Sequence, residues 1–96
     1  MAVKYMIYFP EYILVSNISS SSKRTYKSQL NQFFQFLGNK PLNRKNVAKY
    51  LEYLENKNVK EGKKLSDKTI LLKLTIIRRF TKFLWEENQL SDNEYK

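Results

Sequence analysis

The chain has 96 residues, of which 42% are hydrophobic and 28% are charged, a composition that allows one folded domain with its own core. It contains no cysteine and no histidine, which excludes disulfides, thiolate metal sites and the usual general base of a catalytic mechanism. Eighteen Lys and Arg stand against nine Asp and Glu, and the net charge of +9 favours a polyanionic partner.

The charges are segregated along the sequence. No acid occurs in residues 12–51, which carry seven basic residues, and Asp67 is the only acid among seven more basic residues in 63–82. Residues 83–95 reverse the balance, with four acids and no base. Such segregation is typical of a surface that meets a polyanion, although a solvated lysine-rich surface would give the same counts.

The N-terminal part begins with an apolar run that Pro10 and Glu11 interrupt. No cleavage site follows, and no stretch approaches the roughly 20 apolar residues of a membrane span, so we expect a soluble, cytoplasmic protein without membrane contact. Pro10 suits the first turn of a short helix. Residues 1–8 alternate as in a strand, but a single strand would have no partner, and we treat them as an N-terminal extension.

A polar, serine-rich stretch over residues 17–22 precedes the clearest helical periodicity in the chain. Apolar residues recur there with helical spacing: Tyr26, Leu30, Phe33 and Leu37, with Phe34 beside them. Ser22 is the expected N-cap, and Gly38 followed by Pro41 is expected to end this helix. Its opposite face offers hydrogen-bonding side chains without an acid, namely Arg24, Ser28, Asn31 and Gln35, with Lys27 alongside.

Asn43 is the expected N-cap of a third helix with Glu52 and Glu55 on its outer side. Its predicted core positions are Val47, Tyr50, Leu51 and Leu54. A charged loop that contains Gly62 then leads to the longest predicted helix, residues 66–87, with Ser66 as its N-cap.

On a helical wheel, the apolar residues of 66–87 cover more than half the circumference, so several neighbours must cover this helix. They are Ile70, Leu72, Leu74, Ile76, Ile77, Phe80, Phe83, Leu84 and Trp85. Most of the remaining surface is a cationic stripe of Lys68, Thr75, Arg79 and Lys82. The sequence therefore predicts a central helix of a small bundle that exposes one positive edge.

The two best predicted helices open alike, because residues 22–26 and 66–70 share the pattern S-x-[KR]-T-[YI]. A capped helix N-terminus that carries a cation and a hydroxyl is suited to binding a phosphate group. A serine that only caps its helix would explain either copy alone. The repetition favours the phosphate-binding interpretation.

Three segments together resemble a known family. They are S-S-K-R-T-Y-x3-L-x2-F-x2-F-L, then P-L-x4-V-x2-Y-L-x2-L, then S-x-K-T-I-x3-L-x2-I-R-x-F-x2-F-L. This spacing is similar to the N-terminal core-binding domain of tyrosine site-specific recombinases of the phage-integrase type. The resemblance implies an all-α, SAM-like bundle of four to five helices over residues 9–90, with residues 91–96 as a linker or tail.

In that family the domain clamps one side of a DNA duplex, and the second and fourth long helices lie against the groove. Carried over by position, the resemblance implies these DNA-binding residues: Lys23, Arg24, Thr25, Lys27, Ser28, Asn31, Lys68, Thr69, Leu72, Ile76 and Arg79. Leu72 and Ile76 depart from the family, which usually places polar groups there. They could contact thymine methyl groups, pack on a catalytic domain, or belong to the core.

The catalytic set of the family is an Arg, a Lys, a His-x-x-Arg and a nucleophilic Tyr, all in a second domain. We expect this chain to bind DNA without cutting it, and to need no cofactor and no metal. The implied partners are double-stranded DNA, a catalytic domain of the same protein if the gene encodes one, and other recombinase protomers on the DNA. Asn93-Glu94 stands where the family usually has Asn-Pro, so the connection to a catalytic domain stays open.

Two other functions remain open at this point. One is a helical protein-interaction module without DNA affinity, in which Leu72, Ile76 and Phe83 would form the partner groove. The other is a transcription regulator, but the loop before Ser66 is about ten residues long, which does not fit the short turn of a helix-turn-helix.

Overall fold

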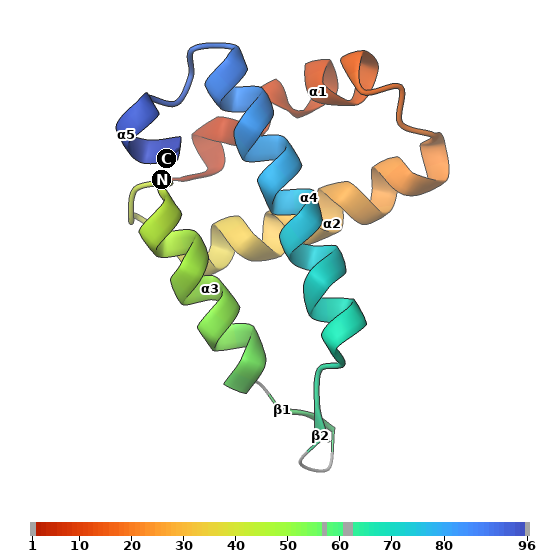
Figure 1. Ribbon diagram of the computed structural model, residues 1–96. Helices are drawn as coiled ribbons and strands as arrows, with labels where there is room; N and C mark the ends of the chain where they lie inside the picture. The colour runs from red at the N-terminus through yellow and green to blue at the C-terminus, as the bar shows by residue number, and fades with distance from the viewer. Residues whose placement is uncertain (1, 57, 61–62, 96) are drawn as a thin grey trace.

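The computed structural model describes residues 2–56, 58–60 and 63–95. Its elements are η1 (Ala2–Tyr8, a 3₁₀ helix), α1 (Phe9–Val15), α2 (Ser20–Leu37), α3 (Arg44–Asn56), β1 (Asn58–Lys60), β2 (Lys63–Lys64), α4 (Asp67–Glu86) and α5 (Asp92–Tyr95). Figure 1 shows that helices form the body of the molecule, while β1 and β2 pair antiparallel in the connection from α3 to α4. The predicted all-α bundle is confirmed.

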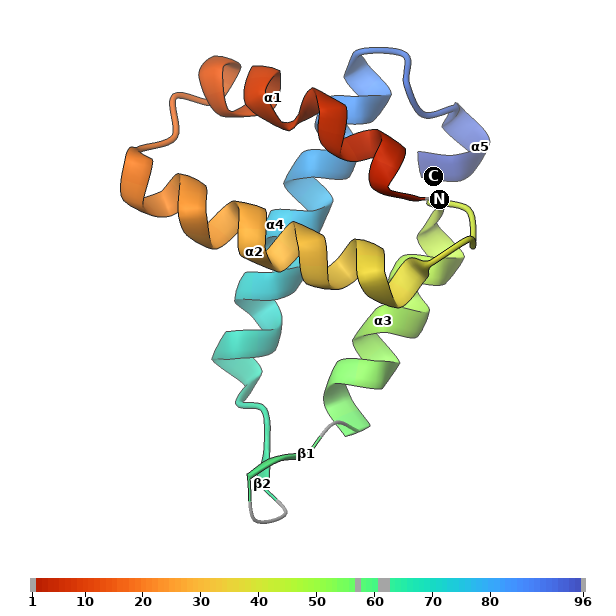
Figure 2. The same ribbon diagram turned by 180° about the vertical axis from the view of Figure 1, so that it is seen from behind.

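The two longest helices, α2 and α4, cross each other. α4 lies in front of α2 in Figure 1 and behind it in Figure 2, where η1 and α1 are seen to run along α2. α3 packs against both α2 and α4, η1 packs on α2, and α5 folds back onto α4. α4 is therefore covered by several neighbours, as expected for the predicted helix over residues 66–87.

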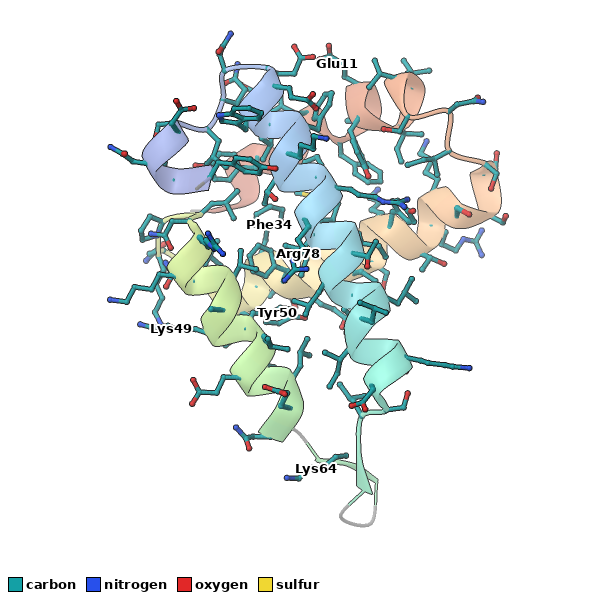
Figure 3. The ribbon with its side chains drawn as sticks, in the orientation of Figure 1. Glu11, Phe34, Lys49, Tyr50, Lys64 and Arg78 are labelled. Atoms are coloured by element: carbon teal, nitrogen blue, oxygen red, sulfur yellow. The ribbon has the colours of Figure 1, made fainter. Side chains whose placement is uncertain are left out.

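Aromatic side chains hold the crossing together. Phe80 of α4 is fully buried and makes edge-to-face contacts with Tyr12 of α1 and Phe34 of α2, at ring-centroid distances of 5.3 and 6.2 Å. Phe33 of α2 contacts Tyr50 of α3 in the same way at 5.1 Å. Each such pair adds about 0.5–1.5 kcal/mol beyond the burial of its surface. Figure 3 shows Phe34 and Tyr50 in the space that α2, α3 and α4 enclose.

The extension predicted for residues 1–8 is helical over Ala2–Tyr8 and packs on the bundle. Tyr5 is buried and stacks on Phe34 at 6.1 Å. Its burial, with Glu94 as a smaller contribution, raises the pKa of the Tyr5 phenol. α1 follows directly, and Pro10 lies in its first turn as predicted. The alternation of apolar residues in this segment therefore reflects a tight helix and not a strand.

The start of α2 differs from the prediction. The N-cap is Ser19, whose side-chain oxygen accepts a hydrogen bond from the Ser22 backbone N–H at 3.4 Å, so the predicted cap at Ser22 is wrong. Four consecutive serines can each cap a helix, and the apolar periodicity begins only at Tyr26, so the sequence does not decide among them. Gly38 ends α2 as predicted, with φ at +58°.

The caps of α3 and α4 are confirmed. Asn43 Oδ1 accepts from the backbone N–H of Asn46 at 2.8 Å, directly before α3. Ser66 Oγ accepts from the backbone N–H of Thr69 at 3.3 Å and fixes the start of α4. Within the described ranges, no helix is long and apolar enough to cross a bilayer.

Candidate nucleic-acid interface

The exposed face of α2 carries most of the predicted contact residues of that helix. A shallow depression on this face is lined by Arg24, Lys27, Ser28, Asn31, Gln32 and Gln35. Lys23 and Thr25 are exposed on the same helix. α2 contains no acidic residue at all, so this face combines cations with neutral hydrogen-bonding groups. Gln32 was not predicted from the sequence, although it stands one residue after Asn31 and four after Ser28 on the polar side of the helix.

The exposed side of α4 carries the predicted cationic stripe. Lys68, Arg79 and Lys82 are exposed, and Thr75 is half-buried between them. The acids of α4 lie only at its two ends, Asp67 and Glu86. The interior of the stripe is therefore positive along most of the helix, which suits an extended anionic partner.

Thr69 has a structural role within this site. Its hydroxyl lies 2.9 Å from Ser66 Oγ, in addition to the capping bond from its backbone N–H. The Thr69 side chain is half-buried, so it supports the N-terminus of α4 next to the exposed Lys68. A ligand at this end would meet the cation of Lys68 and the positive end of the helix dipole.

Two neighbouring residues of the predicted contact surface differ in their exposure to solvent. Leu72 is 48% exposed, whereas Ile76 is fully buried at 0%. Ile76 lies on the helix between Lys73 and Arg79, which both donate hydrogen bonds to α2, so the crossing itself covers it. The prediction that Ile76 contacts DNA is therefore wrong, and Ile76 belongs to the core. Leu71, which no prediction included, is 62% exposed beside Leu72.

Lys73 is the second residue that sequence reasoning missed. Its side chain is only 8% exposed, and its ammonium donates to Gln29 Oε1 at 2.7 Å and to Gln32 Oε1 at 3.2 Å. The signal was available, because Lys73 precedes Ile77 by four residues and Phe80 by seven, which is the spacing of a core position.

Arg79 connects the cationic stripe to α2. Its guanidinium donates to the hydroxyl of Tyr26 at 3.3 Å, and the Tyr26 ring stacks on Tyr12 at 6.4 Å. The pKa of Tyr12 is raised to about 12, chiefly by burial and to a smaller extent by Tyr26, while Arg79 acts to lower it. Tyr12 therefore stays neutral near pH 7, and the hydrogen bond from Arg79 to Tyr26 joins the cationic stripe of α4 to α2.

Most of the predicted contact residues lie on two arms that leave the crossing, whereas Ile76 and Arg79 lie at the crossing itself. The N-terminal halves of α2 and α4 diverge from each other in Figure 1, so Arg24 and Lys68 lie on different arms. Lys73 and Arg79 connect the helices at the crossing between these arms. The site is therefore an open V-shaped surface, and the structure shows no direct bond from Arg24 or Lys27 to the predicted contacts of α4.

A second hollow lies away from this surface, between α3, α4 and α5. Its lining includes Arg44, Leu51, Arg78 and Leu90, and none of the predicted contact residues. Figure 3 shows Arg78 between α3 and α4. Among the described residues, no group of acidic, histidine or cysteine side chains could hold a metal ion.

Comparison with protein-family models matches residues 7–88 to the N-terminal SAM-like domain of phage integrase. Comparisons with curated proteins and with solved structures found no match. The matched region contains α1 to α4, and with them both arms of the candidate interface. The matched domain is not itself catalytic. The chain belongs to the family of phage integrase N-terminal SAM-like domains.

Proposed function

We propose that these 96 residues are the DNA-binding N-terminal part of a tyrosine site-specific recombinase. In this role the V-shaped surface of α2 and α4 holds one face of the recombination-site duplex, and a separate catalytic domain cuts the DNA. The observation that supports the proposal most strongly is the charge of the two arms. α2 has no acid, and α4 has acids only at its ends, in a chain that belongs to an integrase family.

The proposed contacts come from both helices. α2 contributes Lys23, Arg24, Thr25, Lys27, Ser28 and Asn31, and α4 contributes Lys68, Thr69, Leu72 and Arg79. The lysines and arginines neutralise phosphates, which gives affinity without sequence preference, while Ser28 and Asn31 can bond phosphate oxygens or base edges. A single small domain reaches few phosphates, so we expect weak binding, with Kd around 10⁻⁴ to 10⁻⁶ M.

The protein-interaction module is less well supported by the same geometry. Its partner groove would need Leu72, Ile76 and Phe83 on the surface, but Ile76 and Phe83 are buried in the core. Leu71 and Leu72 are the exposed apolar residues of α4, and they lie on the arm that carries Lys68. A short apolar contact flanked by cations fits a DNA groove, where thymine methyl groups offer apolar surface.

The test compares two pairs of charge-removing substitutions. The first pair, Arg24→Ala with Lys68→Ala, removes one exposed cation from each arm. The control pair, Lys45→Ala with Lys49→Ala, removes two exposed cations from α3, where Figure 3 shows Lys49 extending away from the bundle. Duplex binding is measured by fluorescence anisotropy at several salt concentrations, and thermal melts check that each variant folds.

We expect the first pair to weaken duplex binding and to reduce the slope of log Kd against log salt by about two, one for each lost phosphate contact. The control pair should change the slope little. Equal losses from the two pairs would mean that only net charge matters, and would contradict the assignment of the interface to α2 and α4. Binding by the unmodified chain that does not weaken with salt would contradict DNA binding through these cations.

A further inference from the structure

Lys73 fixes the orientation of two side-chain amides on the neighbouring helix. Its ammonium donates to the Oε1 atoms of Gln29 and Gln32, at 2.7 and 3.2 Å. An ammonium group has three N–H donors and no acceptor, so each glutamine must turn its oxygen, and not its nitrogen, toward Lys73. Gln32 is exposed and Gln29 is half-buried, so both side chains reach the surface of α2 with the oxygen held inward.

The orientation of the Gln32 amide also determines the hydrogen bonding of Ser28. Gln32 Nε2 donates to Ser28 Oγ at 3.4 Å. Since the Ser28 oxygen accepts this bond, its own O–H can donate to a group outside the protein. Both Ser28 and Gln32 line the depression on α2 that also holds the cations Arg24 and Lys27.

This part of α2 therefore presents hydrogen-bond donors. Phosphate oxygens carry no hydrogen in DNA and act only as acceptors, so a row of donors beside two cations is their chemical complement. If the Gln32 amide turned over, its Nε2 would face the Lys73 ammonium and its carbonyl oxygen would lose that bond. Ser28 could then donate to the glutamine and would no longer offer its hydrogen to a ligand.

We propose that Lys73 is a positioning residue for DNA binding: without touching the DNA, it holds Gln29, Gln32 and Ser28 so that α2 presents donors to phosphate oxygens. The inference rests on the proposed function and adds a residue that is buried and outside the predicted contacts. It also explains why a lysine occupies this core position, where an apolar residue would pack equally well.

The first test replaces Lys73 by methionine, which keeps an unbranched apolar stem and removes the donors. We expect duplex binding to weaken about fivefold, the value of roughly one hydrogen bond, in a variant that melts as a folded protein. Lys73→Arg keeps donors at the crossing and should restore most of the affinity. Lys49→Met removes the same charge from an exposed position of α3, outside the proposed interface, and measures the effect of charge alone.

A double-mutant cycle shows whether Lys73 acts through the glutamines. In a chain that carries Gln29→Ala with Gln32→Ala, adding Lys73→Met should weaken duplex binding no further. A loss of equal size in both backgrounds would mean that the Lys73 charge acts on DNA directly, and would overturn the proposal. If Lys73→Met does not fold, the glutamine pair alone carries the test, because it should weaken binding about fivefold in a folded chain, and unchanged affinity overturns the proposal.

Nuclear magnetic resonance gives a readout that does not depend on DNA. The side-chain NH₂ protons of Gln32 should show nuclear Overhauser contacts to the β protons of Ser28 in the unmodified chain and lose them in Lys73→Met. Failure of this inference alone would leave the effects of Arg24→Ala with Lys68→Ala intact while Lys73→Met binds normally. Failure of the proposed function would instead remove salt-dependent binding from the unmodified chain, and with it this role of Lys73.

Discussion

Replacing Ile76 by alanine should destabilise the fold far more than replacing Leu72, four residues earlier on the same helix. The Ile76 side chain is fully buried at the crossing of α2 and α4, whereas Leu72 is about half exposed. Removing a buried isoleucine side chain costs about 2–5 kcal/mol, from the lost transfer free energy and the cavity that remains. A surface substitution such as Leu72→Ala changes the free energy of unfolding by about 0.5 kcal/mol or less.

The size of this effect can be measured by thermal unfolding. For a domain of this length, 1 kcal/mol lowers the Tm by about 4–8 °C, so Ile76→Ala should lower it by about 8 °C or more. The total free energy of unfolding of such a domain is about 5–15 kcal/mol, so Ile76→Ala can approach complete unfolding. Ile76→Val is therefore the graded variant, with an expected cost of about 0.5–1.5 kcal/mol.

The same variants test the orientation of α4 against DNA. Ile76→Val should leave duplex binding unchanged, because its side chain does not reach the surface. Equal Tm losses for Ile76→Ala and Leu72→Ala would contradict the orientation of α4 in which Ile76 is buried and Leu72 is exposed. A loss of DNA binding by a fully stable Ile76→Val would mean that Ile76 contacts the DNA.

Two further predictions concern stability. Ser19→Ala should lower the free energy of unfolding by about 1 kcal/mol because it removes the N-cap of α2, while Ser22→Ala should change it little. Urea unfolding measures both variants, and a larger loss for Ser22→Ala would mean that Ser22 is the N-cap. Burial raises the pKa of Tyr12 from 10.0 to about 12, so the folded state favours the neutral phenol; this stabilisation is complete below pH 10 and is lost as the pH rises through about 12. Tyr12→Phe should therefore lose less stability between pH 9 and 12 than the unmodified chain, and an identical alkaline loss would exclude Tyr12 as its source.

The helices themselves could be predicted from the sequence because strong local signals agreed. Ser66 and Asn43 are isolated capping residues before clear apolar periodicity, and both cap their helices in the structure. The run of four serines before α2 does not indicate which serine is the N-cap, because each of the four side chains can cap a helix equally well. The 3₁₀ helix η1 could not be predicted, because its alternating apolar residues fit a strand equally well, and only packing on α2 settles its conformation.

The candidate site was harder to predict because exposure depends on tertiary packing. Leu72 and Ile76 are both apolar residues on one flank of the α4 wheel, and only the position of α2 decides that one is buried and the other is not. Lys73 is a charged residue, which one helix alone would place on the surface, but the crossing buries it. Two glutamine oxygens accept the hydrogen bonds that water would otherwise accept from its ammonium. A wheel built from one helix contains no information about its partner.

DNA binding through α2 and α4 is tested most directly by titrating the ¹⁵N-labelled chain with a short DNA duplex and recording ¹H–¹⁵N correlation spectra. If α2 and α4 hold the duplex, backbone amide shifts should change most over residues 23–32 of α2 and 66–72 at the N-terminal end of α4. These changes should diminish as salt is added, because phosphate contacts release counterions. Shifts confined to α3 or α5, or no salt-sensitive shifts at all, would contradict the assignment of the DNA-binding surface to α2 and α4.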